Sequence, residues 1–150
     1  MDINSNRLLL EIWDTAGQER YRSLIRHFFR KTEGIFLVFD LTDIKSFEDL
    51  TFWMTLIREE SSISPIIHLI ANKSDIIDKI EVPNLLIDKF CSDNSLQFRQ
   101  VSAKTNTNVA EAFEWMSQAI MNKSIKDSSN QNSIIIEKRP TDKACISCNK

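Results

Sequence analysis

Three short, nearly continuous apolar runs constrain the fold of this chain more than any other feature of its sequence. They cover residues 8–13, 35–41 and 66–71, and residues 96–101 form a weaker fourth run. Apolar runs of this length without polar alternation are typical of strands covered on both faces, as in a parallel sheet. The sequence therefore predicts at least three buried parallel strands.

Segments with helical periodicity separate these runs. The clearest follows Asn108, a second follows Ser46, and Pro83 can open a third. In the first two, apolar side chains recur every three or four positions, at Val109, Ala112, Phe113, Met116 and Ile120 and at Phe47, Leu50, Met54 and Ile57. Alternation of strands and helices predicts an α/β fold built on a doubly wound, mostly parallel sheet.

The periodic pattern stops near residue 122. A length of 150 residues suits one domain with a tail. Residues 123–150 are rich in Ser, Asn, Asp and Lys and show no sustained period. We therefore expect a folded domain over residues 1–122 and a disordered tail over residues 123–150.

Composition excludes several classes of protein. A formal net charge of -2 argues against a nucleic-acid binder. No apolar run approaches the ~20 residues that span a bilayer, and no basic-then-apolar stretch opens the sequence. Cys91, Cys145 and Cys148 are an odd number of cysteines and form no disulfide framework. These features favour a cytoplasmic protein.

Three polar stretches follow predicted strands, where ligands bind in open α/β sheets. The first, D-T-A-G-Q-E, begins at Asp14, whose carboxylate can hold Mg²⁺ through water. Gly17 lets a backbone N–H approach a terminal phosphate, and Gln18 can orient an attacking water. The alternative interpretation is an ordinary polar turn, because Asp and Gly favour turns.

The second and third stretches, N-K-S-D and S-A-K, carry groups that can recognise guanine. The two oxygens of Asp75 can accept from the paired N–H groups on one edge of guanine, an edge that adenine lacks. Lys73 can lay its aliphatic stem along a ring or ribose. Ala103 can donate its backbone N–H to the guanine oxygen, with Lys104 over the base. Either stretch alone is equally consistent with a solvated loop.

Together, in this order, the three stretches resemble the motifs of Ras-superfamily GTPases. Their flanks resemble the Rab family. Residues 8–13 resemble its interswitch strand, and R-Y-R-S-L-I at residues 20–25 resembles its second switch. F-F-R-K-T at residues 28–32 resembles the segment Y-Y-R-G-A of that family, and residues 37–42 resemble its strand L-V-Y-D-I-T. The resemblance covers residues 7–121. It implies the sheet of the small GTPase type, related to that of P-loop NTPases.

The resemblance implies a switch that binds GTP or GDP with Mg²⁺ and regulates vesicle-mediated transport. It assigns catalysis to Gln18 and the water-mediated metal contact to Asp14. It assigns contacts with the nucleotide to Gly17, Asn72, Lys73, Asp75, Ser102, Ala103 and Lys104. Implied partners are effectors, exchange and activating factors, and the prenylation escort protein. The implied location is peripheral, on the cytosolic face of endomembranes.

The sequence also departs from the family. It contains no G-x-x-x-x-G-K-[ST] phosphate-binding loop, and Gly17 and Gly34 are its only glycines. The first switch and the strand that should lie between residues 8–13 and 35–41 are also absent, so we expect an N-terminal truncation of roughly fifty residues. GTPase activity is therefore uncertain, and we expect the chain alone to be inactive. The alternative is a non-catalytic Rab-like module that binds a partner through its second-switch surface.

Two cysteines near the end of the sequence suggest lipidation. Rab tails carry geranylgeranyl groups on one or two cysteines, and two lipid chains anchor stably where one does not. The resemblance therefore assigns prenylation to Cys145 and Cys148, although half a zinc site remains an alternative.

The sequence supports only general expectations for two large aromatic residues and two histidines. Trp13 and Phe28 align with two members of the family's effector-reading aromatic patch, with core packing as the alternative. His27 and His68 lack spaced metal-ligand partners, so each is expected to be a surface histidine or a satisfied core histidine.

Overall fold

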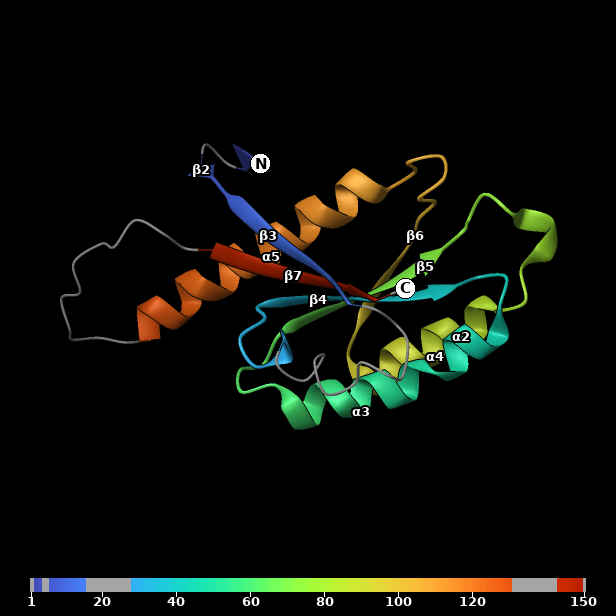
Figure 1. Ribbon diagram of the computed structural model, residues 1–150, viewed down its shortest axis with the longest axis horizontal. Helices are drawn as coiled ribbons and strands as arrows, with labels where there is room; N and C mark the ends of the chain where they lie inside the picture. The colour runs from blue at the N-terminus through green and yellow to red at the C-terminus, as the bar shows by residue number, and fades with distance from the viewer. Residues whose placement is uncertain (1, 4–5, 16–27, 131–142, 150) are drawn as a thin grey trace.

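A five-stranded, all-parallel sheet organises the computed structural model, which describes residues 2–3, 6–15, 28–130 and 143–149 (Figure 1). In spatial order its strands are β3 (Leu9–Thr15), β7 (Lys143–Asn149), β4 (Gly34–Asp40), β5 (Ile66–Asn72) and β6 (Gln97–Gln100). A separate antiparallel pair joins β1 (Asp2–Ile3) to β2 (Asn6–Arg7). The four apolar runs thus form four of the five strands, as predicted.

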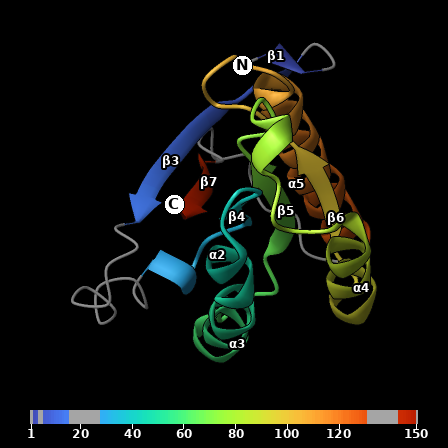
Figure 2. The ribbon, with the colours of Figure 1, turned by 90° about the vertical axis from the view of Figure 1, so that its right-hand side faces the viewer.

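Helices cover both faces of this sheet. Figures 1 and 2 show α2, α3 and α4 on one side and α5 on the other. Their bounds are α2 (Ile44–Glu48), α3 (Leu50–Glu60), α4 (Asn84–Asn94) and α5 (Val109–Asn130), with a short 3₁₀ turn, η2 (Ile77–Lys79), before α4. This arrangement confirms the doubly wound α/β fold. None of the described helices is long and apolar enough to cross a membrane.

Side chains of β4 alternate between two apolar cores. Ile35 and Leu37 pack with α3 and α4, whereas Phe36 packs with α5. Since successive residues of a strand point to opposite faces, one apolar run serves both layers. At Gly34, α5 approaches so closely that a β-carbon would lie 2.6 Å from the sulfur of Met116. A side chain at position 34 would therefore displace Met116.

The structure describes two parts of the segment that the sequence analysis expects to be a tail. Helix α5 continues to Asn130, and residues 143–149 form β7, while residues 131–142 lie outside the described part. Strand β7 occupies the position between β3 and β4 where the sequence predicts a missing strand. Backbone groups of buried strands need hydrogen-bond partners, and β7, with the sequence K-A-C-I-S-C-N, supplies them to β3 and β4.

His68 is a buried histidine without the expected hydrogen bonds. Its side chain is 1% exposed, and neither ring nitrogen has a hydrogen-bond partner within the described residues. Its ring lies against Trp115, with centroids 3.8 Å apart. Burial, and secondarily the charge of Arg99, lowers the pKa of His68 from 6.5 to about 4. The imidazole is therefore neutral in the folded protein at physiological pH.

This burial predicts a stability that falls in mild acid. Protonation of His68 favours the unfolded state, where its pKa is 6.5. The free energy of unfolding is therefore unaffected by His68 above that pH and decreases as the pH falls toward 4. The loss from His68 reaches roughly 2 kcal/mol by pH 5. Denaturant titrations at pH 7.5 and pH 5 should show this difference in the wild type and lose it in His68→Phe. An equal drop in both proteins would exclude His68 as the cause.

Candidate functional site

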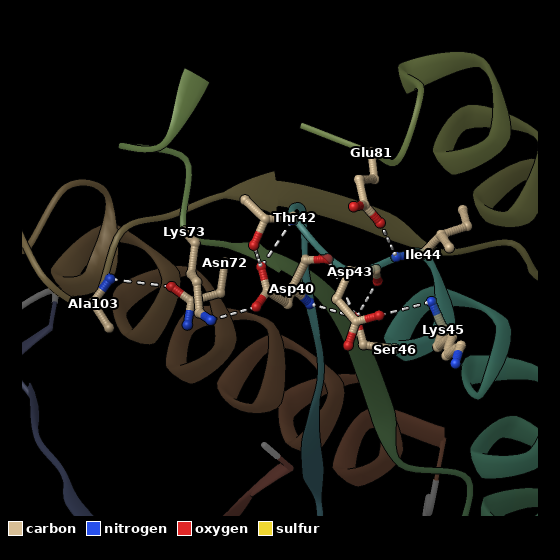
Figure 3. Close-up of polar contacts among 10 residues, drawn as sticks. All are labelled: Asp40, Thr42, Asp43, Ile44, Lys45, Ser46, Asn72, Lys73, Glu81 and Ala103. Atoms are coloured by element: carbon tan, nitrogen blue, oxygen red, sulfur yellow. Dashed lines mark hydrogen bonds and ion pairs between the residues drawn. The ribbon is translucent and has the colours of Figure 1, made fainter. Parts of the chain in front are cut away.

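Two of the three predicted stretches meet at the carboxyl edge of β5 and β6. The N–H of Ser74 donates to the carbonyl of Val101 over 3.0 Å. The side-chain oxygen of Asn72 accepts from the N–H of Ala103 over 3.1 Å (Figure 3). These bonds join the N-K-S-D loop to the S-A-K loop, so residues about thirty positions apart form one surface.

Ser102 fixes the acidic side chain of this surface. Its buried hydroxyl donates to a carboxylate oxygen of Asp75 over 2.7 Å and accepts from the N–H of Thr105 over 3.1 Å. Backbone bonds between Ser102 and Thr107 in both directions close the loop. The hydroxyl of Ser102, with smaller contributions from the charges of Lys104 and Lys73, holds the pKa of Asp75 below its ordinary value. Asp75 is therefore a fixed, ionised acceptor.

Lys73 is turned toward Asp40 at the end of β4 (Figure 3). Its backbone adopts φ 64°, in the left-handed region, and its ammonium group forms an ion pair with the Asp40 carboxylate. The same carboxylate accepts from the N–H and the hydroxyl of Thr42, over 2.8 and 2.7 Å. Burial raises the pKa of Asp40, but the bonds from Lys73 and Thr42 outweigh it, so the net shift is downward. The hydrogen bond to Asp40 raises the pKa of Lys73.

Asp40 was not among the predicted site residues. The parallel register pairs Asp40 with Asn72, which places the carboxylate next to the residue that follows Asn72. The sequence held one signal for it, because an Asp followed two positions later by Thr is typical of a turn closed by the Asp side chain.

A second layer of bonds holds the end of β4. The hydroxyl of Ser46 accepts from the N–H of Asp40 over 2.9 Å, and Asp43 caps α2 by accepting from the N–H of Lys45 over 3.0 Å. The predicted helix after Ser46 therefore begins earlier, after Asp43, as the short helix α2. Glu81 accepts from the N–H of Ile44, which ties the segment before α4 to this layer (Figure 3).

A cavity of about 320 Å³ adjoins the joined loops. Most of its described lining is apolar and comes from β3, β4, β5 and α5, including Ile12 and Phe113. Its polar lining includes Asp14, Asn72 and the backbone of Ala103. The first predicted stretch therefore contributes Asp14, which is exposed at the end of β3, to the same region as the other two.

The remaining predicted site residues are less well placed. Gly17 and Gln18 lie in residues 16–27, outside the described part of the chain. Cys145 and Cys148 lie in β7. Among the described residues, no cluster of three His, Cys, Asp or Glu side chains could hold a metal ion. A metal held here would therefore need ligands besides Asp14.

Trp13 and Phe28 lie against each other, with ring centroids 5.0 Å apart. The Trp13 side chain remains 42% exposed, so this pair contributes aromatic surface at the end of β3.

Comparison with known proteins matches the chain to a family model and to individual relatives. The model of the Ras family matches residues 1–122. The chain is 39% identical to Ras-related protein Rab-13 of Bos taurus over 124 residues, which is 83% of this chain and 61% of that protein. It is 36% identical to Ras-related protein Rab-8B of Pongo abelii over 133 residues, 89% of this chain and 64% of that protein. The chain thus spans less than two thirds of the length of these relatives.

The contact between Ser102 and Asp75 predicts a measurable change in acidity. In Ser102→Ala the carboxylate loses its donor, so the pKa of Asp75 should rise toward the ordinary value of a carboxyl group. An NMR titration that follows the carboxyl carbon of Asp75 measures it. Ser74→Ala is the matched control, because Ser74 contacts Val101 through its backbone N–H. An unchanged pKa in Ser102→Ala would show that the hydroxyl does not hold Asp75.

Proposed function

The chain belongs to the Ras family as a Rab-type small GTPase, and from this membership we propose that it recognises guanine nucleotide at the carboxyl edge of β5 and β6. The observation that carries the proposal is the pair of bonds that joins the two loops there, from Ser102 to Asp75 and from Ala103 to Asn72. These bonds hold together the groups that we assign to base recognition.

Asp75 supplies the selectivity for guanine in this proposal. Guanine presents two N–H donors side by side, which a carboxylate accepts with both oxygens. Adenine lacks this pair of donors, so it would leave the carboxylate unpaired at a cost in binding free energy. Because Ser102 uses only one lone pair of one oxygen, enough acceptor capacity remains for both guanine donors.

The backbone N–H of Ala103 has a second role in the proposal. In the structure it donates to the side-chain oxygen of Asn72, whereas the sequence analysis assigned it to the guanine oxygen. Binding through this N–H therefore requires the bond to be shared with Asn72 or transferred from it. Lys73 and Lys104 are both exposed, and we assign them to the faces of the base. Lys73 must keep or exchange its ion pair with Asp40 when it does so.

The phosphates and Mg²⁺ are assigned to the first stretch. Mg²⁺ in such sites uses one or two carboxylates together with phosphates and waters, so the exposed carboxylate of Asp14 fits a water-mediated contact. When bound, the ion neutralises phosphate charge. We assign the terminal phosphate to the backbone of Gly17 and the attacking water to Gln18.

In the cell, we propose that this switch regulates vesicle-mediated transport. The exposed Trp13 with its neighbour Phe28 supports an aromatic surface for effectors. Exchange and activating factors would set its nucleotide state. Geranylgeranyl groups on Cys145 and Cys148, added with an escort protein, would hold it on the cytosolic face of endomembranes.

A second candidate function is a non-catalytic interaction module. Its expected partner surface, the second switch at residues 20–25, lies outside the described part of the chain. The pairing of Trp13 with Phe28, which follows this segment in the sequence, supports a partner surface that needs no nucleotide. The two candidates differ in one measurable property, which is the dependence of partner binding on guanine nucleotide.

The assignment of Asp75 predicts a change of base preference. Asp75→Asn replaces an acceptor by a donor, so affinity for GDP should fall by about tenfold or more, because a buried donor would face another donor. Xanthosine diphosphate presents an acceptor there and should gain relative affinity. NMR titrations with both nucleotides and Mg²⁺ measure this, even for weak binding. Asp78→Asn, in the neighbouring η2 turn, is the control and should behave as the wild type. If Asp75→Asn keeps the wild-type preference, Asp75 does not recognise the base.

A further inference from the structure

The carboxylate of Asp40 uses its two oxygens for different partners. One oxygen, Oδ1, accepts from the N–H and the hydroxyl of Thr42 over 2.8 and 2.7 Å. The other oxygen, Oδ2, forms the ion pair with the ammonium group of Lys73 (Figure 3). The first contact closes the turn after β4, and the second reaches the N-K-S-D loop after β5. Asp40 thus links the end of β4 to the loop that we assign to base recognition.

Asp40 is held by several hydrogen bonds besides its contact with Lys73. Its backbone N–H donates to the hydroxyl of Ser46 over 2.9 Å, and Thr42 fixes its side chain. The side chain is 21% exposed, whereas that of Lys73 is 50% exposed. Because Asp40 is already ordered, the ion pair requires the ordering of the Lys73 side chain alone. Asp40 is therefore a prepared acceptor for a long and flexible side chain.

Lys73 also interacts with Asp75, two positions later in the same loop. The hydrogen bond to Asp40 is the main cause of the raised pKa of Lys73, and the charges of Asp43 and Asp75 contribute less. In turn, the pKa of Asp75 is lowered mainly by the hydroxyl of Ser102, and the charge of Lys73 adds to this effect. An ammonium group paired with Asp75 would compete with the guanine donors for the same carboxylate.

We propose that Asp40 is a positioning residue of the base site, which holds the ammonium group of Lys73 at the end of β4 and so keeps Asp75 available to guanine. This inference rests on the proposed recognition of guanine by Asp75. Asp40 itself makes no contact with the nucleotide and acts through Lys73. The aliphatic stem of Lys73 can lie on a face of the base while its ammonium group stays with Asp40.

The consequence for binding is a change in population. When Lys73 pairs with Asp40, both oxygens of Asp75 can accept from guanine. When Lys73 pairs with Asp75, the ammonium group must leave before guanine binds. The apparent affinity falls in proportion to the fraction of molecules in the first arrangement. Removal of the charge of Asp40 should therefore weaken the binding of guanine nucleotide.

Two substitutions separate positioning from support of the turn. Asp40→Asn keeps an oxygen that accepts from Thr42 but presents an uncharged amide group to Lys73. Asp40→Glu keeps the charge, which the flexible Lys73 can follow, but its longer side chain disturbs the bonds to Thr42. If Asp40 only supported the turn, Asp40→Glu would be the more harmful change. If it positions Lys73, Asp40→Asn is the more harmful change.

An NMR titration with guanosine diphosphate and Mg²⁺ distinguishes these cases. Affinity should fall at least about threefold in Asp40→Asn and stay closer to the wild type in Asp40→Glu. Asp49→Asn is the control for the loss of one negative charge, because its side chain makes no capping bond at the start of α3, and it should bind as the wild type. The opposite order of the two Asp40 variants, or a higher affinity in Asp40→Asn, would overturn the proposal.

A double-mutant cycle tests whether Asp40 acts through Lys73. Lys73→Met keeps an apolar side chain but removes the ammonium group, so Asp40→Asn should cause no further loss of affinity in this background. An equal loss in both backgrounds would overturn the proposal.

The pKa of Asp75 provides a measurement that needs no nucleotide. In Asp40→Asn, Lys73 should turn toward Asp75, so an NMR titration of its carboxyl carbon should show a pKa lower than in the wild type. Loss of the Asp40 charge has the same sign, so this fall must be larger with Lys73 present than in Lys73→Met. Equal falls would overturn the proposal. If no variant binds guanosine diphosphate, the proposed function is overturned, whereas a larger fall here would still support the placement of Lys73 by Asp40.

Discussion

The parallel pairing of β4 with β5 is the interaction on which the rest of the structure depends. It runs over seven positions, from Gly34 opposite Ile66 to Asp40 opposite Asn72. Because the side chains of both strands alternate between the two faces, this register builds both cores at once. The last pair of this register places the carboxylate of Asp40 beside Asn72, at the start of the polar site. A slip of β5 by one residue would turn Leu69 to the face opposite Leu37 and separate Asp40 from Lys73.

The ion pair between Lys73 and Asp40 has more effect on position than on stability. The Lys73 side chain is half exposed, and ion pairs between exposed side chains contribute little to stability. The pair directs the Lys73 side chain toward Asp40, beside the loop that we assign to base recognition. Ser102, by contrast, is fully buried, and its hydroxyl has a partner on each side. Burial and two hydrogen bonds thus fix Ser102 more firmly than one ion pair fixes the half-exposed Lys73.

Sequence reasoning was most accurate where the signal was local. Apolar runs located β3, β4 and β5 because burial on both faces is visible in composition, and periodicity located α5. It failed where partners are distant in the chain. The pairing of Asp40 with Lys73, the bond from Ala103 to Asn72 and the unsatisfied nitrogens of His68 depend on register and packing. Strand β7 was missed because its short apolar stretch, residues 144–146, lies at the end of a segment rich in Ser, Asn and Lys, and because its pairing depends on two strands that are distant in the sequence, β3 and β4.

Base recognition with nucleotides that lack the second and third phosphates tests the central claim most directly, since it separates the loops at β5 and β6 from the rest of the proposed nucleotide site. Guanosine monophosphate and adenosine monophosphate can be titrated in parallel while amide NMR signals of Ser74, Asp75 and Ala103 are followed. The account predicts saturable shifts of these signals with the guanine nucleotide and much smaller shifts with the adenine nucleotide, because only guanine offers paired donors to Asp75. Equal shifts with both nucleotides, or no shifts with guanine at saturating concentration, would contradict it.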